Sequence, residues 1–325
     1  MLLIVGLLLL AGLCLYIAGE LLVSGLLRLS RFFRVKEFVV AFFVMAFAGT
    51  LPNFFVGVTS ALQGIPELSF GDVMGNNIVA LTLAVVLALL LSPHKELPFE
   101  NKTAQRTTYF TAVAALLPLI LISDGVLSRA DGIILILFFV IYVVWLFSRD
   151  HNFSKPYEEH EALSFKEGRK GALQAIAKVL LGLTLLAVSA QVVVYAAEGI
   201  ATGLGIPLIA IGILVVGFAG ALPELYFTVV SARKGETGMI LGNLMGAVIS
   251  PATLVLGMVA LIHPIENENL EFPLIGRLFL VFLALYFLFI ARTKHAITRR
   301  EGYVLLVIYV AFLVALITGG IQAMH

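Results

Sequence analysis

"FAGTLPN" at residues 47–53 and "FAGALPE" at residues 218–224 each interrupt a long apolar run in this chain. Proline removes a backbone hydrogen-bond donor and glycine loosens a helix, so each stretch predicts a broken helix. Inside a bilayer, the carbonyl groups that such a break frees must be satisfied by an ion, water or a neighbouring group. The two stretches therefore predict a polar site inside an apolar protein.

The composition is that of an integral membrane protein. Of the 325 residues, 61% are hydrophobic and 13% are charged, whereas about a quarter of a soluble domain is charged. A membrane-spanning helix needs about 20 mostly apolar residues. Apolar runs predict ten such helices, at about 2–27, 38–62, 72–92, 107–123, 130–148, 174–200, 207–232, 239–262, 273–291 and 302–320.

Several other classes of protein are disfavoured. The 21 basic and 20 acidic residues nearly balance, which argues against a nucleic-acid partner. Cys14 is the single cysteine, so no intramolecular disulfide can form. Because no catalytic triad, P-loop or thiol motif is evident, we expect neither an enzyme nor a bound cofactor.

The basic residues predict how the chain is oriented. Alternate loops hold 18 of the 21 lysines and arginines, and the loops between them contain only Arg129. Cytoplasmic loops collect Lys and Arg, so we expect both termini on the non-cytoplasmic side, most simply of the cell (inner) membrane. The longest break, residues 149–171, is predicted to be a cytoplasmic linker between five-helix halves at 1–148 and 172–325; its histidines and acids indicate a solvated linker rather than a metal site.

An internal repeat relates these halves. Residues 38–83 and 209–254 share 16 identities at a constant offset of 171, including glycines and prolines in register. Five helices separate the copies, so they begin on opposite sides of the membrane. The predicted fold is therefore an all-α membrane protein of ten transmembrane helices in two inverted five-helix repeats. Inverted repeats with broken helices are typical of secondary transporters, although a pair of ordinary proline kinks would give the same local pattern.

Polar residues inside the spans are the candidate ligands of a transported cation, because ionisable groups there are costly. Glu224 directly follows Pro223, and its repeat partner is Asn53. The hydroxyl of Thr50 and the side chains of Asp72, Asn76 and Asn243 complete the predicted set. Glu20, paired with Gln191 by the repeat, could support these ligands, line an access path or bond to a neighbouring helix.

At this point the motifs resemble a known family. "FAGTLPN" followed by "GDVMGNNI" at 71–78, and "FAGALPE" followed by "GNLMGAVI" at 242–249, resemble the two α-repeats of the cation/calcium exchanger superfamily, which includes prokaryotic sodium/calcium exchangers. The family pattern is approximately G-T-S-x-P-E and then G-N-x-x-G-S-N, so the α-repeats would span about 38–92 and 207–262. The resemblance implies cation exchange by alternating access, with ligands from four repeat helices.

The chain departs from that family pattern at its ion site. Asn53 occupies the position of the first acid, and Asn76 and Ala247 replace serines. Ala80 and Pro251 occupy positions where the family has a further Asn or Asp. Calcium prefers six to eight oxygen ligands and usually several carboxylates. Glu224 alone suits sodium or a proton better, but Asp72 would restore a second charge if it faced the same cavity.

The sequence therefore predicts a secondary active cation antiporter with inorganic cations (Ca²⁺, Na⁺ or H⁺) and the lipid bilayer as its partners. The alternative is a degenerate protein that keeps the exchanger fold without exchange and acts in binding or assembly. A channel fits less well, because no helix carries a continuous line of polar residues. The exchange ratio and the oligomeric state are left open.

Overall fold

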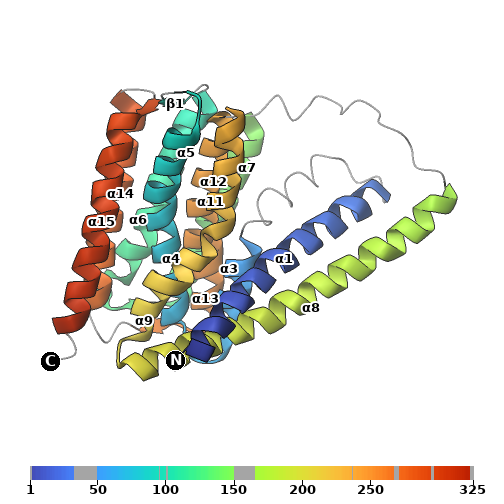
Figure 1. Ribbon diagram of the computed structural model, residues 1–325, viewed down its shortest axis with the longest axis horizontal. Helices are drawn as coiled ribbons and strands as arrows, with labels where there is room; N and C mark the ends of the chain where they lie inside the picture. The colour runs from blue at the N-terminus through green and yellow to red at the C-terminus, as the bar shows by residue number, and fades with distance from the viewer. Residues whose placement is uncertain are drawn as a thin grey trace.

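The computed structural model of the protein describes residues 2–32, 50–94, 96–99, 102–149, 165–235, 237–266, 271–293 and 296–322, and nearly all of them are helical (Figure 1). The first half contains α1 (Leu2–Phe32), α3 (Leu51–Leu62), α4 (Glu67–Val79), η1 (Ala80–Ala84), α5 (Val85–Leu91), β1 (Glu96–Pro98), α6 (Lys102–Leu121), η2 (Ile122–Asp124), β2 (Val126–Leu127) and α7 (Arg129–Arg149). The second half contains α8 (Phe165–Leu204), α9 (Leu208–Ile211), η4 (Gly212–Val216), α10 (Gly217–Gly220), α11 (Leu222–Lys234), α12 (Thr237–Ser250), η5 (Pro251–Val255), α13 (Leu256–Ile262), β3 (Ile265–Glu266), α14 (Glu271–Thr293), β4 (Ala296–Thr298) and α15 (Arg299–Gln322).

Eight helical segments in the described ranges are long and apolar enough to cross a membrane. They coincide with eight of the ten predicted helices. Of the other two, the prediction at 38–62 is described only in its second part, as α3, and the prediction at 302–320 corresponds to α15. Helix α8 begins at Phe165, inside the stretch predicted as linker, and residues 150–164 lie outside the described ranges.

The boundaries of the elements recur at the offset of 171 that relates the two sequence motifs. Helices α3 and α11 begin at equivalent positions, and so do the π-helical segments η1 and η5 and the helices α5 and α13 that follow them. An equivalent threonine in each π-helical segment bonds to a carbonyl of the helix that precedes it. The Thr82 hydroxyl donates to the carbonyl of Ile78 at 2.5 Å, and that of Thr253 donates to Ile249 at 2.6 Å.

Two short strand pairs tie distant parts of the chain together. Strand β1 pairs antiparallel with β4, with Leu97 opposite Ile297. Strand β2 pairs antiparallel with β3, with Leu127 opposite Ile265. All four of these apolar residues are almost fully buried. The strands were not predicted, because two or three residues between helices carry too little alternation to be recognised.

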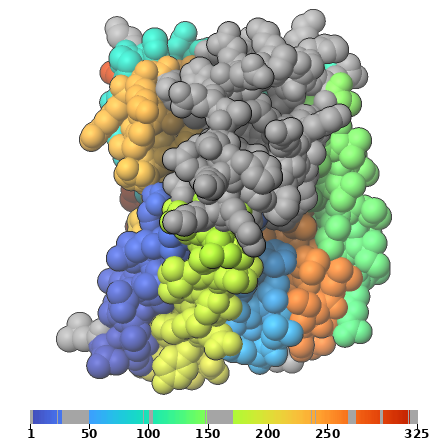
Figure 2. All heavy atoms as spheres, turned by 90° about the vertical axis from the view of Figure 1, so that its right-hand side faces the viewer, coloured from blue at the N-terminus to red at the C-terminus, as the bar shows by residue number. Residues whose placement is uncertain are grey.

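Helices α1 and α8 form a pair that is inclined to the other helices (Figure 1). Figure 2 shows them side by side on one face of the molecule, with α3 next to α8. Small residues allow this close approach, because a methyl group on Gly182 would lie 3.0 Å from the carbonyl oxygen of Ala18. Buried apolar side chains of this pair, such as Leu8 and Val193, form one cluster with Leu68 of α4 and Ile211 of α9.

Helix α4 crosses η4 and α10 at backbone contact, and glycines make this contact possible. A methyl group on Gly75 would lie 2.1 Å from the carbonyl oxygen of Ile213, and one on Gly212 would lie 2.6 Å from that of Leu68. A methyl group on Gly217 would lie 2.7 Å from the carbonyl oxygen of Asp72. Small residues at helix crossings let backbones approach within membranes. This crossing holds the polar residues of α4 against the broken helix.

Candidate cation site

The break in the second half is one residue long. Helix α10 ends at Gly220, Ala221 forms a turn, and α11 begins at Leu222. Pro223 has no N–H to donate to the carbonyl of Ala219 four residues earlier, so that carbonyl loses its usual helical partner. Glu224 lies in the first turn of α11 and its side chain is 4% exposed. The partial positive charge of a helix N-terminus favours a carboxylate at this place.

The equivalent break in the first half is described from Thr50 onward. Helix α3 begins at Leu51, with Pro52 in its first turn and Asn53 at the position equivalent to Glu224. The side chains of Thr50 and Asn53 are 5% and 2% exposed. Both halves thus bury a polar side chain immediately after the proline, and only the second half buries an acid there.

Helix α4 brings a second acid into the interior. Asp72 and Asn76 are four residues apart and therefore lie on one face of this helix. Their side chains are 1% and 0% exposed. Among the residues that the structure describes, neither carboxylate oxygen of Asp72 has a hydrogen-bonding partner. The stripe of α4 that carries Asp72 is adjacent to the Gly71 and Gly75 stripe, which contacts η4 and α10.

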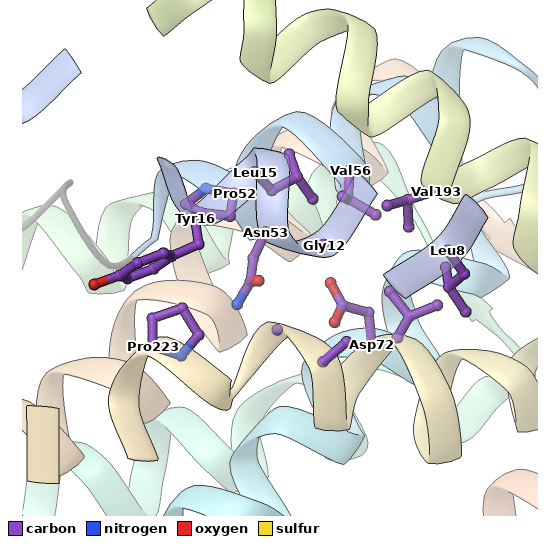
Figure 3. A pocket seen from close by; sticks show the side chains of 13 residues that line it. Leu8, Gly12, Leu15, Tyr16, Pro52, Asn53, Val56, Asp72, Val193 and Pro223 are labelled. Carbon is purple, nitrogen blue, oxygen red and sulfur yellow. The ribbon is translucent and has the colours of Figure 1, made fainter. Parts of the chain in front are cut away.

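Asp72 and Asn53 converge on Gly220. A methyl group on Gly220 would lie 2.9 Å from Oδ1 of Asn53 and 3.3 Å from Oδ1 of Asp72. Figure 3 shows the two side chains pointing toward one cavity, which Pro223 and Tyr16 also line. The volume of this cavity is about 30 Å³, whereas a water needs about 10–15 Å³ on the same measure. The cavity can therefore hold a cation that keeps part of its hydration.

Two buried carboxylates belong to this region. Asp72 lines the cavity, and Glu224 lies four residues after Gly220, in the first turn of α11. Within the described ranges, Oε2 of Glu224 has no hydrogen-bonding partner either. Burying an unpaired charge is costly, so the arrangement is suited to a cation that these oxygens would bind. Carboxylate, amide and carbonyl oxygens are ligands of hard cations such as Na⁺ and Ca²⁺.

A hydrogen bond between repeat-equivalent positions orients a further amide. The Nδ2 atom of Asn76 donates to the backbone carbonyl of Ala247 at 3.1 Å, and these residues are 171 positions apart. In the first half, the backbone N–H of Ala80 donates to the carbonyl of Asn76. Pro251, the equivalent of Ala80, cannot make that bond to Ala247 because it has no N–H.

The side chain of Asn76 thus replaces the donor that Pro251 lacks. Because its nitrogen is engaged with Ala247, its Oδ1 atom is left without a partner among the described residues. This oxygen is buried one helical turn from the carboxylate of Asp72, and it is available to a cation.

The structure does not bring every predicted candidate to the cavity. Glu224, Thr50 and Asn76 are buried but do not line it. Asn243 on α12 is half-buried and does not line it. Glu20 on α1 is exposed and does not line it, and it accepts a hydrogen bond from Tyr16 at 2.5 Å. Tyr16, its hydrogen-bonding partner, belongs to the same helix and lines the cavity. Within the described residues, no group of three or more His, Cys, Asp or Glu side chains could hold a metal.

Sequence reasoning missed two residues of the cavity. Gly220 was read only as part of the helix break, although its lack of a side chain makes room for Asn53 and Asp72. Tyr16 gave no signal, because a tyrosine within an apolar helix is common at a membrane interface. Tyr16 also packs edge-on against Tyr226 of α11, with ring centroids 6.5 Å apart.

Comparisons with known proteins give consistent matches over nearly the whole chain. A family model described as "Sodium/calcium exchanger protein" matches residues 3–148 and 175–318. An uncharacterized membrane protein of Methanocaldococcus jannaschii is 27% identical over 315 residues, which are 97% of this chain and 98% of that protein. The sodium/calcium exchanger MaX1 of Methanosarcina acetivorans is 26% identical over 369 residues, covering 95% and 97%. The solved structure of the sodium-calcium exchanger NCX_Mj, soaked with Na⁺ and Sr²⁺, superposes with a TM-score of 0.63 at 27% identity, covering 96% of this chain and 98% of that one.

Proposed function

Because the chain belongs to the sodium/calcium exchanger protein family, we propose that it is a secondary active antiporter that exchanges cations at the site between α3, α4 and the α10–α11 break. The candidate ions are Ca²⁺, Na⁺ and H⁺. One observation carries this proposal. The carboxylates of Asp72 and Glu224 are both buried inside a membrane protein, with oxygens that have no partner among the described residues. Such groups mark an ion pathway in membrane proteins.

The proposed ligands follow from the geometry of the site. Glu224 and Asp72 supply charge, and Asn53 and Asn76 supply amide oxygens. The proposed set also includes Thr50, at the break of the first half, and Asn243, on the helix equivalent to α4. We propose that a different state of the transporter brings these two residues closer to the cation. Alternating access needs such a second arrangement, since each ligand set must open to one side at a time.

The proposed architecture is ten transmembrane helices in two inverted halves, residues 1–148 and 172–325. The recurrence of α3, η1 and α5 as α11, η5 and α13 supports a repeat. Helices α1 and α8, which occupy equivalent places in the two halves, run in opposite directions in Figure 1, which supports inversion. The beginning of α1 and the end of α15 lie at the same end of the molecule, as an even number of spans requires.

The proposed orientation places both termini on the non-cytoplasmic side of the cell membrane. Its support is the charge of the loops, because the basic residues of the sequence gather in alternate connections. Arg233 and Lys234 at the end of α11 and Arg299 and Arg300 at the start of α15 belong to the same set of loops. The strand pair of β1 and β4 closes this end of the bundle.

Sodium-driven uptake of ⁴⁵Ca²⁺ into proteoliposomes tests the proposal, with a pH gradient as the second driving force. We expect uptake by the native protein and at least a tenfold loss in Glu224→Gln, which keeps the shape of the side chain and removes its charge. Asp124→Asn, which changes an exposed acid at the end of η2, is the matched control and should transport normally. Exchange by Glu224→Gln at the native rate would contradict the assigned role. Absence of flux with every driving force would instead favour a degenerate, non-transporting protein.

A further inference from the structure

The start of α6 and the end of α14 bring two arginines to one tyrosine. Arg106 and Tyr109 are three residues apart on α6, so they lie on one face of that helix. The guanidinium carbon of Arg292, in the last turn of α14, lies 5.7 Å from the centre of the Tyr109 ring. All three side chains are exposed. Two positive charges therefore flank one aromatic ring on the surface of the protein.

The fold holds these two helix ends together. Helices α6 and α14 lie side by side (Figure 1). Strand β1 precedes α6, strand β4 follows α14, and the two strands pair with each other. The backbone positions of Arg106 and Arg292 are therefore set by paired secondary structure.

The three side chains lie at the depth where a membrane surface would meet the helices. The candidate span on α6 begins at Ala104, and the one on α14 ends at Thr293. Arg106 and Arg292 are thus within one turn of the ends of the spans, and Tyr109 lies about one turn deeper than Arg106. Aromatic side chains gather at the level of the lipid headgroups, and basic residues near a membrane surface attract anionic lipids.

Deeper on the same helix faces, the exposed side chains are apolar. Val113 is four residues after Tyr109 on α6, and Phe289 is three residues before Arg292 on α14. Their side chains are 45% and 59% exposed. A ligand that contacts the arginines and these apolar side chains together must have an anionic head and a long apolar tail. Inorganic phosphate has the first feature and lacks the second.

We propose that the start of α6 and the end of α14 form a binding site for one anionic phospholipid. The guanidinium groups of Arg106 and Arg292 bind its phosphate, because the planar donor groups of arginine match phosphate oxygens. The ring of Tyr109 orients the guanidinium of Arg292 through a cation–π interaction, and the acyl chains cover Val113 and Phe289. None of these residues lines the cavity beside Asp72, so the site does not depend on the proposed antiport.

Native mass spectrometry of the full chain measures this binding, with dioleoyl phosphatidylglycerol as the anionic lipid and dioleoyl phosphatidylcholine as the zwitterionic one. We expect the native protein to bind one phosphatidylglycerol at least tenfold more tightly than phosphatidylcholine. The double variant Arg106→Gln with Arg292→Gln should lose this preference. Arg233→Gln with Lys234→Gln removes the same charge from exposed positions at the end of α11, and it should keep the preference. The proposal is overturned if the first variant keeps the preference or if both variants lose it equally.

Competition separates a lipid from a free anion. We expect millimolar inorganic phosphate and the short-chain lipid dihexanoyl phosphatidylglycerol to displace dioleoyl phosphatidylglycerol poorly, because neither covers Val113 and Phe289. Displacement by inorganic phosphate would identify an anion site that does not select lipid, and it would overturn the assignment.

Thermal unfolding in detergent makes an independent test, because a ligand that binds the folded state raises its apparent stability. Without lipid, both double variants should melt as the native protein does, since all four altered side chains are exposed. Phosphatidylglycerol should raise the melting temperature of the native protein and of the variant at 233 and 234, but not that of the variant at 106 and 292. Equal shifts in all three proteins would overturn the proposal. None of these measurements requires transport, so the lipid site and the antiport can fail separately.

Discussion

The hydrogen bond from Asn76 to Ala247 leads to a prediction about stability that a double-mutant cycle can measure. Asn76→Ala removes the donor to a carbonyl that Pro251 cannot serve. Pro251→Ala supplies a backbone N–H at this position, as Ala80 does for the carbonyl of Asn76 in the first half. We therefore expect Asn76→Ala to be less destabilising when residue 251 is alanine.

The size of this coupling follows from interhelical hydrogen bonds in membrane proteins. Such bonds contribute about 0.6 kcal/mol on average and at most about 1.7 kcal/mol. The coupled carbonyl is buried, because Ala247 is 8% exposed and Asn76 is 0% exposed, so we expect a coupling of about 1 kcal/mol. The cavity that Asn76→Ala leaves is common to both backgrounds, so the cycle cancels it.

Equilibrium unfolding in mixed micelles can follow this coupling through Trp145, the single tryptophan, whose ring lies 4.6 Å from that of Phe110. The measurement belongs in sodium-free, calcium-free buffer, because Oδ1 of Asn76 is a proposed ligand and bound ions would shift stability. Costs of Asn76→Ala that agree within about 0.3 kcal/mol in the two backgrounds would refute the reasoning.

Three further predictions use single substitutions. Gly75→Ala should lower the free energy of unfolding by about 1–3 kcal/mol, the usual cost of overpacking, because the new methyl group would lie 2.1 Å from a backbone carbonyl oxygen. Gly6→Ala is the control: its methyl group would have no atom within 4 Å, so the melting temperature should stay the same or rise. Gly220→Ala should reduce calcium binding at least tenfold while changing the melting temperature little, since the methyl group would fill the cavity between Asn53 and Asp72; binding at the native level would contradict the placement of the site. Asp131→Ala should destabilise the start of α7 by about 1 kcal/mol, because this carboxylate accepts bonds from the N–H and hydroxyl of Ser128 at 2.8 and 2.6 Å; unchanged amide exchange at the start of α7 would contradict this.

Most of the fold could be predicted from the sequence, because long apolar runs and repeated glycines and prolines are strong signals. The helix break between Gly220 and Leu222 was predicted from Gly220 and Pro223, and it is one residue long. The π-helical segments were not predicted. Pro251 marks the start of η5, but Ala80 at the start of η1 has no special backbone chemistry.

The site was only partly predictable, because its assembly depends on which face of α4 meets the second half. Asp72 could not be assigned to the cavity from its position alone. The spacing of Gly71 and Gly75 nevertheless contained the signal, since a glycine stripe marks the contact with another helix and Asp72 lies on the adjacent stripe. The bond between Asn76 and Ala247 required the structure, because no local pattern connects residues so far apart.

The pairing of β1 with β4 also has a consequence for biosynthesis. Leu97 is made early, whereas its partner Ile297 emerges near the end of translation. Until then, the hydrogen-bonding groups of β1 have no strand partner, and unpaired strand edges invite association with other chains. A chain that terminated before Ala296 would leave this strand edge without its partner.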